Sequence, residues 1–378
     1  MTVRTDPAVA SELVRASPAQ LFEPVTIGSL AVPNRIVMAP MTRAFAIGGV
    51  PHEEFASYYR RRAEGGVGLI VTQGTWIGHP LASNNPGVPN FFGAKALGGW
   101  KRIVDEVHAA GGRIIPQLWH VGLFTSARDR LTPGSAPNGP SGLSPDGARL
   151  AEPMGQPDID EVIEAFASGA VAARELGFDG VELHGAHGYL LDQFFWSKTN
   201  RRRDRYGGDL VARTRFAVEI VEEVKRRAGR EFPVSLRFSQ WKGQDYEARL
   251  FESPAELERW LAPLVAAGVD VFHCSTRRYW AAEFEGSDLN LAGWTKKLTG
   301  MPTITVGAVG LDREFTRRGE LAQPAWLGPL LDRLARGEFD LVALGRPLIA
   351  NPAWPELVAR GAFDELQAYD PDQLKTLT

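Results

Sequence analysis

Cysteine is almost absent from the sequence, since Cys274 is the only one in 378 residues. One thiol cannot form a disulfide within the chain, and it cannot hold an iron–sulfur cluster through cysteines alone. Long apolar runs are missing too, because none reaches the roughly 18 residues expected of a membrane-spanning helix. These absences argue against a disulfide-built secreted protein and against a membrane protein, and they predict a cytoplasmic location.

An excess of charge of either sign is also missing. The 42 Lys and Arg residues nearly balance the 45 Asp and Glu residues, which gives a net charge of −3. Such a balance produces no general attraction to nucleic acid or to an anionic membrane. We therefore expect neither as a partner, and any anionic ligand has to be held by a local site.

From Leu21 onward, short apolar runs alternate with amphipathic stretches that are typical of helices. The runs are continuous rather than alternating in polarity, as expected of strands that are covered on both faces. They cover residues 35–39, 68–72, 113–118, 180–184, 233–238, 269–273, 302–306 and 340–345. Eight strand–helix units predict an α/β fold, the parallel eight-stranded (β/α)8 TIM barrel, with its active site at the C-terminal face of the strands. The rival fold is a doubly wound sheet, which usually has an early Gly-rich strand-to-helix turn that this sequence lacks.

The two ends of the chain fall outside this alternation. The first 20 residues lack the apolar core of a secretory signal and mix charges such as Arg4 and Glu12. We predict a flexible extension at residues 1–20, a single barrel domain at residues 21–360, and a C-terminal tail at residues 361–378 whose packing stays open.

Capping signals mark the starts of two predicted helices. Asp158 followed by Glu161 is a variant capping box that precedes an apolar face. Ser253 and Pro254 combine an N-cap with a proline at the first helical position, and Glu256 adds a capping carboxylate. Both signals place a helix before the strand that follows.

A short pattern recurs where helices lead into strands. A glycine or glutamate, an apolar residue and an aspartate precede three of the predicted strands, ending at Asp179, Asp270 and Asp340. The recurrence predicts a repeated helix-to-strand turn. Two long segments, residues 125–157 and 277–289, break the alternation instead, and we expect them to form walls of a binding site.

The fourth predicted strand ends in a dense polar segment. His184, His187 and Tyr189 follow one another with glycines between them, so three polar tips can gather over one small space. A barrel does its chemistry at this end of its strands. The alternative is a loop in which these side chains only satisfy local hydrogen bonds.

The last two predicted strands end in a pattern suited to phosphate. Gly307 and Gly345 can expose backbone N–H groups, and Arg346 adds a fixed cation. Phosphate sites recur at this position of the barrel. The glycines can equally serve tight turns, with Arg346 paired to a carboxylate.

Three further strand ends carry polar groups that suit a flat heterocycle. Thr42 offers a hydroxyl, Gln117 an amide and Arg237 a permanent cation. Gln117 can instead be a satisfied buried amide. A buried guanidinium, by contrast, needs an anionic or strongly accepting partner.

A series of motifs runs in order along the chain. They are Leu21-Phe22, Ile27-Gly28, Pro33 to Arg43, Tyr58-Tyr59 with Arg62-Ala63, Gln117 to His120, His184 to Phe195, Arg203 to Gly208, and Leu344 to Pro352. Together they resemble the Old Yellow Enzyme family of FMN-dependent ene-reductases. The segment from His184 is the most specific of them. Thr42 stands where another branch of the family carries cysteine, so the chain resembles the threonine-bearing branch.

The resemblance implies a tightly bound, non-covalent FMN, with NAD(P)H as co-substrate. The residues implied in cofactor binding are Pro40, Met41, Thr42, Gly74, Gln117, Arg237, Gly307, Gly345 and Arg346. Trp119 and Thr42 are implied in the substrate pocket. The family chemistry is a ping-pong transfer of hydride from NAD(P)H, through FMN N5, to the β-carbon of α,β-unsaturated carbonyl or nitro compounds.

The resemblance also assigns roles to the polar segment after the fourth strand. His184 and His187 would bind the activating oxygen of the alkene, and Tyr189 would protonate its α-carbon. Activated alkenes and phenols are the implied small-molecule ligands, and both a monomer and a homodimer stay open. The tail has no obvious counterpart of the pocket tyrosine that family members often supply there, and Phe363 and Tyr369 are candidates.

Two other functions remain open from the residues alone. The first is a metal-dependent hydrolase on the same barrel, with His184 and His187 joined by Glu182 or Asp192. The second is a flavin-binding barrel without turnover. The first leaves Gln117 and the phosphate-type strand ends unexplained, and the second leaves the polar segment without a use.

Overall fold

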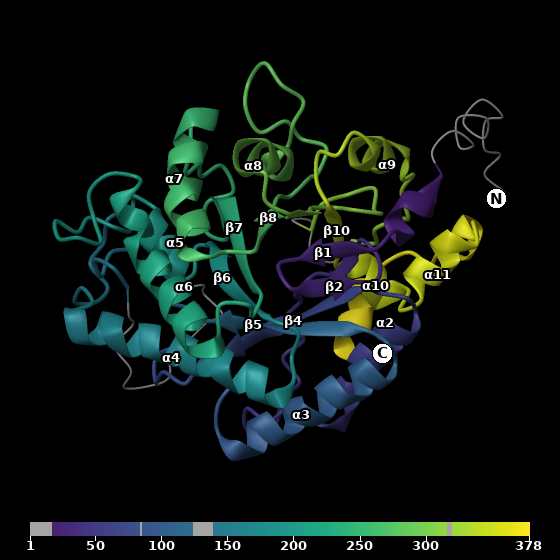
Figure 1. The fold of residues 1–378 in the computed structure, drawn as a ribbon, viewed down its shortest axis with the longest axis horizontal. Helices are drawn as coiled ribbons and strands as arrows, with labels where there is room; N and C mark the ends of the chain where they lie inside the picture. Colours follow the sequence, from purple (N-terminus) through teal and green to yellow (C-terminus); the bar gives the residue numbers. More distant parts are fainter. Residues whose placement is uncertain (1–16, 84, 124–138, 316–319) are drawn as a thin grey trace.

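The computed structural model describes residues 17–83, 85–123, 139–315 and 320–378, and in them eight parallel strands close into a barrel. The order around the barrel is β10-β3-β4-β5-β6-β7-β8-β9, and Figure 1 shows the helices packed around it. The strands are β3 (Ile36–Met38), β4 (Leu69–Trp76), β5 (Arg113–Trp119), β6 (Val181–His187), β7 (Val234–Lys242), β8 (Val271–Ser275), β9 (Thr303–Val306) and β10 (Leu341–Leu344). Each falls within or overlaps one predicted apolar run, so the barrel prediction is confirmed.

Helices follow the strands and form the outer layer. They are α2 (Glu53–Glu64), α3 (Ala94–Ala109), α4 (Gln156–Leu176), α5 (Leu190–Phe195), α6 (Arg215–Ala228), α7 (Pro254–Ala267), α8 (Leu291–Thr299), α9 (Gly328–Ala335), α10 (Arg346–Ala350) and α11 (Trp354–Ala359). Four 3₁₀ helices are η1 (Pro18–Phe22), η2 (Ala212–Thr214), η3 (Phe363–Glu365) and η4 (Pro371–Lys375). No helix of the described residues is both long and apolar enough to cross a lipid bilayer.

A small hairpin closes the N-terminal end of the barrel. It consists of β1 (Val25–Ile27) and β2 (Leu30–Val32), which pair antiparallel. Ile27, Leu30 and Val32 are buried in one cluster with residues from the starts of the strands, such as Leu69 and Leu341. The interior at the starts of the strands is therefore closed by an apolar plug.

The predicted helix starts are borne out at one site and shifted at the other. Ser253 is the N-cap of α7, and its hydroxyl accepts a hydrogen bond from the Glu256 amide at 3.3 Å. The prediction that Asp158 opens a helix is wrong by three residues, because Gly155 is the N-cap of α4. Asp158 lies in the first turn, where its carboxylate accepts from the Gly155 amide at 2.7 Å.

The three recurring aspartates fasten neighbouring strands together. Each carboxylate accepts a hydrogen bond from a backbone amide at the start of the preceding strand, and a basic side chain of the helix before that strand contacts it too. The sets are Asp179 with Ile114 N (2.7 Å) and His108 Nε2 (2.8 Å), Asp270 with Val234 N (2.7 Å) and Lys225 Nζ (2.6 Å), and Asp340 with Thr303 N (3.0 Å) and Lys296 Nζ (2.7 Å). The repeated turn is thus a staple at the N-terminal end of the barrel.

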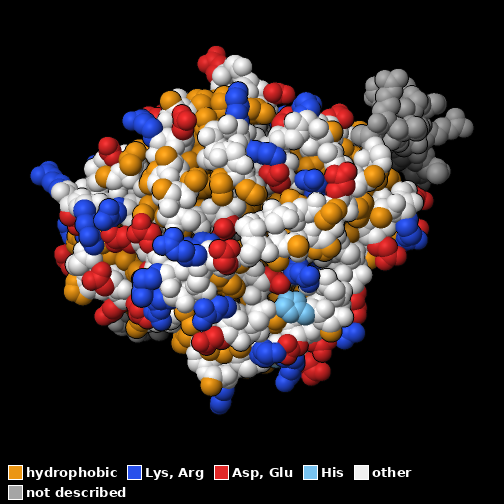
Figure 2. Space-filling model, in the orientation of Figure 1, with side chains coloured by type: hydrophobic (Ala, Val, Ile, Leu, Met, Phe, Trp, Pro, Cys, Tyr) orange, Lys and Arg blue, Asp and Glu red, His pale blue; other side chains and the backbone are white. Residues whose placement is uncertain are grey.

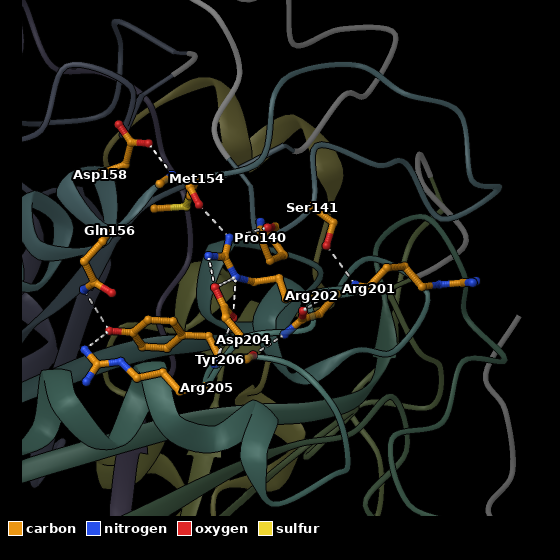
Figure 3. Close-up of polar contacts among 12 residues, drawn as sticks. Pro140, Ser141, Met154, Gln156, Asp158, Arg201, Arg202, Asp204, Arg205 and Tyr206 are labelled. Atoms are coloured by element: carbon orange, nitrogen blue, oxygen red, sulfur yellow. Dashed lines mark hydrogen bonds and ion pairs between the residues drawn. The ribbon is translucent and has the colours of Figure 1, made fainter.

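The family-like segment Arg203 to Gly208 serves the fold and lies apart from the site's chemistry. The neighbouring Arg202 donates from Nη1 to the carbonyl oxygens of Pro140 (2.7 Å) and Met154 (2.6 Å), as Figure 3 shows. The Tyr206 hydroxyl contacts Gln156, Glu219 and Arg205. These contacts tie residues 140–156 to the chain that follows α5.

The two ends of the described chain lie on the outside of the barrel. Arg43 and Arg62 donate to backbone carbonyl oxygens of the tail, at Gln373 (3.1 Å) and Thr378 (2.6 Å). The C-terminal end therefore lies beside α2, as Figure 1 also shows. On the face drawn in Figure 2, acidic and basic side chains are interspersed, in keeping with the small net charge.

We predict that Asp270→Ala lowers the free energy of unfolding by about 2–4 kcal/mol, because it orphans the Val234 amide and removes the partner of the nearly buried Lys225. Urea unfolding measures the change. The matched control is Asp105→Ala, which removes an exposed pair with Lys101 and should change stability by less than about 1 kcal/mol. Equal effects of the two substitutions would contradict the inference that Asp270 joins the two strands.

Candidate active site

A cavity of about 490 Å³ opens where the C-terminal ends of the strands meet. Its lining includes nearly every residue that the sequence nominated for a site: Pro40, Met41, Thr42, Gln117, Trp119, His184, His187, Tyr189, Arg237, Gly307, Gly345 and Arg346. These residues come from six different strand ends, and the barrel gathers them around one space.

Gly74 was nominated for cofactor binding but does not line this cavity. A Cβ atom built there would lie 2.4 Å from Cε3 of Trp119, so a glycine is needed for the indole to lie against β4. Trp119 in turn stacks on Trp76, with 4.3 Å between ring centroids. Gly74 thus leaves room for Trp119, whose side chain lines the cavity.

The turn after β6 brings the two histidines and the tyrosine together. His187 has a φ of +66° and Gly188 a φ of +86°, both in the left-handed region that non-glycine residues rarely adopt. The turn places the His184 ring 5.2 Å from His187 and 5.0 Å from Tyr189, measured between centroids. The predicted clustering of these three side chains is what the structure has.

A buried ion pair braces this turn. Asp192 and Lys242 are both fully buried, and their charged atoms lie 2.7 Å apart. The second carboxylate oxygen of Asp192 accepts from the Gly188 amide at 2.7 Å, and Lys242 also donates to the Ser239 carbonyl at 3.0 Å. Removing one partner would leave the other as an uncompensated buried charge. The pair therefore holds the strained backbone in place.

His187 is held by hydrogen bonding on one side and by stacking on the other. Its Nε2 lies 2.8 Å from Ser275 Oγ, and its ring stacks on Trp241 at 4.3 Å between centroids. Arg237 Nη2 donates to the same hydroxyl at 3.4 Å. The Ser275 hydroxyl can then donate to Nε2, which leaves the proton of a neutral His187 on Nδ1.

Both histidines are neutral at pH 7. Burial, followed by the charge of Arg237, lowers the pKa of His184 to about 3. Burial and the same charge hold the pKa of His187 well below its usual range. Each imidazole therefore carries one N–H that can donate to a ligand oxygen.

Several buried polar nitrogens of the cavity wall have no hydrogen-bond partner among the described residues. They are Nε of Arg237, Nε1 of Trp119 and Nδ1 of His184. Burial lowers the pKa of Arg237 to about 10, so its guanidinium is still charged at pH 7. Buried donors without partners are costly. Arg237 and Trp119 therefore each hold a donor without an acceptor among the described residues, and His184 does so in the tautomer that carries its proton on Nδ1.

The opposite end of the cavity holds the residues nominated for phosphate. Gly307 has a φ of +145°, and a Cβ atom there would lie 2.6 Å from the Thr276 carbonyl oxygen. Arg346 lies near Gly345 and donates from Nη2 to the Arg313 carbonyl oxygen at 2.6 Å. No carboxylate pairs with Arg346 among the described residues, so its charge can serve an anion.

Sequence reasoning missed Trp241, Ser275 and Phe315, which also line the cavity. Trp241 and Ser275 lie at the ends of β7 and β8, where inspection of every strand end could have found them. Phe315 lies on an irregular loop with no such signal. Its ring packs on Trp241 at 5.3 Å between centroids.

Two expectations about the walls need correction. Residues 277–289 do not line this cavity, and Arg277 and Glu283 instead line a smaller adjoining hollow of about 190 Å³. Tyr369 and Phe363 do not line the cavity either, since Tyr369 packs against Arg346 and Phe363 is exposed. Of the segment 125–157, which was also expected to form a wall, residues 125–138 lie outside the described residues, and none of residues 139–157 lines this cavity.

A model of the NADH:flavin oxidoreductase / NADH oxidase family matches residues 20–365. The chain belongs to this family. It is 39% identical over 367 residues to 12-oxophytodienoate reductase 7 of Oryza sativa subsp. japonica, which covers 89% of this chain and 87% of that protein. It is 34% identical over 363 residues to an NADH oxidase of Thermoanaerobacter brockii, which covers 92% of this chain but only 52%, about half, of that relative's length.

Solved structures of similar proteins agree with this placement. Morphinone reductase in complex with tetrahydroNAD superposes with a TM-score of 0.78 at 30% identity, over 94% of this chain and 93% of that one. An Old Yellow Enzyme homologue from Zymomonas mobilis superposes with a TM-score of 0.78 at 26% identity, over 95% and 97% of the two chains. The resemblance to the Old Yellow Enzyme family is confirmed, while the threonine-bearing branch stays a prediction.

Family membership makes the protein a flavin-dependent oxidoreductase that uses NAD(P)H, and it sets the hydrolase aside. The described residues contain no group of three His, Cys, Asp or Glu side chains that could hold a metal ion.

We predict a signature of the neutral His184 in the acid stability of the protein. The unfolded chain binds a proton at this histidine below about pH 6.5, whereas the folded protein does so only near pH 3. The contribution of this site therefore falls by up to about 1.4 kcal/mol per pH unit as the pH drops between those values. Urea unfolding at pH 7, 6 and 5 should show that the free energy of unfolding falls less steeply with decreasing pH in His184→Asn than in the wild type. Equal slopes in the two proteins would contradict a neutral, buried His184.

Proposed function

We propose that the protein is an ene-reductase that reduces α,β-unsaturated carbonyl or nitro compounds with electrons from NAD(P)H. The observation that carries the proposal is that two neutral imidazoles and a tyrosine face the same cavity as a buried guanidinium. The donors suit a substrate oxygen, and the cation suits an electron-rich cofactor. Relatives named as reductases support this choice over a binding protein.

The cavity fits FMN by the chemistry of its wall. Arg237 and Gln117 would hold the carbonyl-rich edge of the ring, and Pro40, Met41 and Thr42 would flank it. Gly307, Gly345 and Arg346 would hold the phosphate. When bound, FMN supplies the redox chemistry, taking a hydride from NAD(P)H and passing it to the β-carbon of the alkene.

The chain's own contribution is to stabilise charge and to deliver a proton. His184 and His187 would each donate one N–H to the activating oxygen, where negative charge grows as the alkene is reduced. Arg237 keeps a positive charge beside the ring. Since NAD(P)H and the alkene would use one cavity in turn, the kinetics should be ping-pong.

Tyr189 would protonate the α-carbon. Its ring packs edge-on to Trp119 at 4.7 Å and lies beside His184, so the phenol belongs to the same wall as the oxygen donors. A phenol holds its proton at pH 7 because its usual pKa is about 10. It can still donate to a strongly basic carbon at close range.

The proposal is tested by the visible spectrum of the purified protein. We expect a flavin spectrum that bleaches with NADPH or NADH under anaerobic conditions and recovers when cyclohexenone is added. Bleaching without recovery would leave a flavin reductase that does not act on alkenes. A colourless protein that takes up no added FMN would overturn the cofactor assignment.

We predict that Tyr189→Phe separates the two half-reactions. Reduction by NAD(P)H should stay near the wild-type rate, while the rate of enone reduction falls by about 10²-fold or more, as expected on losing a general acid. Stopped-flow absorbance measures both rates. Equal losses in the two half-reactions would contradict the proton-donor role.

The matched control is Tyr58→Phe. Tyr58 is fully buried outside the cavity, and its hydroxyl has no hydrogen-bond partner among the described residues. Both half-reactions should therefore keep their wild-type rates in this variant.

A further inference from the structure

Glu182 is a buried charged residue that the proposed chemistry does not use. It lies on β6, is fully buried and does not line the cavity. Its carboxylate nevertheless accepts hydrogen bonds from three neighbouring strands. The donors are Gln117 Nε2 (2.8 Å), Ser235 Oγ (2.9 Å) and His273 Nδ1 (2.8 Å).

Glu182 is ionised in this setting. Burial alone would raise the pKa of Glu182, but the hydrogen bonds from His273 and Gln117 and the charge of Arg237 outweigh burial and lower this pKa to about 2. Arg237 is a permanent cation, so it favours the carboxylate at every pH near neutrality. An ionised carboxylate accepts hydrogen bonds and cannot donate them.

This property fixes the orientation of the Gln117 amide. Gln117 and Glu182 are register partners on β5 and β6, so the two side chains leave neighbouring backbone positions. If the amide were flipped, its carbonyl oxygen would face a carboxylate oxygen at 2.8 Å, and both atoms would be acceptors. The NH₂ group must therefore point to Glu182, and Oε1 is the atom left for the cavity that Gln117 lines.

We propose that Glu182 is a positioning residue that presents the Gln117 carbonyl oxygen to the cavity, so that the site selects a ring bearing an imide N–H. The inference rests on the proposed binding of FMN, whose ring has one N–H between two carbonyl groups. Arg237 would then serve a carbonyl oxygen, while Gln117 serves the N–H. Glu182 makes the difference between an amide held as an acceptor and one free to turn.

A purely structural role of Glu182 predicts something different. In that case the carboxylate only satisfies His273 and Ser235 inside the barrel, and its loss lowers stability without changing which ring is bound. Ring selectivity, measured apart from stability and turnover, separates the two roles.

The test uses two ligands of nearly the same shape. FMN and its 3-deaza analogue, which carries a CH₂ group in place of the imide N–H, are titrated into flavin-stripped protein. In the wild type the analogue should bind about tenfold or more weakly, because the buried Gln117 oxygen then lacks its donor. In Glu182→Gln the amide can turn, and the two ligands should bind within about threefold of each other.

Two further variants keep the test decisive. Ser235→Ala removes a different hydrogen bond from the same carboxylate and should keep the full wild-type selectivity. Where Glu182→Gln fails to fold, Glu182→Asp keeps the charge but draws it back from Gln117, and it should narrow the selectivity as well. Wild-type selectivity in a folded Glu182 variant would overturn the inference. Failure of the wild type to bind FMN at all would count against the proposed function instead.

Discussion

The active-site end of this barrel depends on a guanidinium that has almost no partner of its own. Arg237 is 7% exposed. Among the described residues it makes a long hydrogen bond to Ser275 and is attracted by the negative charge of Glu182. A charge in such a place is costly unless a ligand or a countercharge answers it. Glu182 supplies the negative charge from within the barrel, and the cavity leaves room for a ligand that accepts hydrogen bonds from Arg237. Burial lowers the pKa of both histidines most, and the charge of Arg237 lowers it further.

The polar layer extends from this pair across the barrel interior. Gln117, Glu182, Ser235 and His273 come from four adjacent strands, and each contributes to one hydrogen-bond network around the carboxylate. Parallel strands alternate their side chains in and out, and the register of the sheet therefore decides which residues meet. A slip of one residue in β6 would turn Glu182 outward and would break the layer at its centre.

Much of this could be predicted from the sequence, because continuous apolar runs and strand-end polar residues are local signals. The eight strands and the gathering of His184, His187 and Tyr189 follow from them. The contact between Gly74 and Trp119 could not be predicted from such local signals, because it depends on the register between β4 and β5. Nor could the pairing of Asp192 with Lys242, which lie 50 residues apart in sequence. Phe315 reaches the cavity from an irregular loop, where no periodic pattern points to the core.

The strained backbone and the stabilising contacts lie at opposite ends of the barrel. The non-glycine residues with positive φ among the described residues are Ala44, His187 and Ala308. His187 is the last residue of β6, and Ala44 and Ala308 follow the C-terminal ends of β3 and β9. Strained backbone persists only where the surrounding structure over-determines it. In this barrel the surrounding structure is anchored at the N-terminal ends of the strands. The apolar hairpin and the hydrogen bonds of Asp179, Asp270 and Asp340 hold the strands there. Because the strands are anchored there, their other ends can carry a buried cation and a strained turn, and these are the features from which the cavity takes its chemistry.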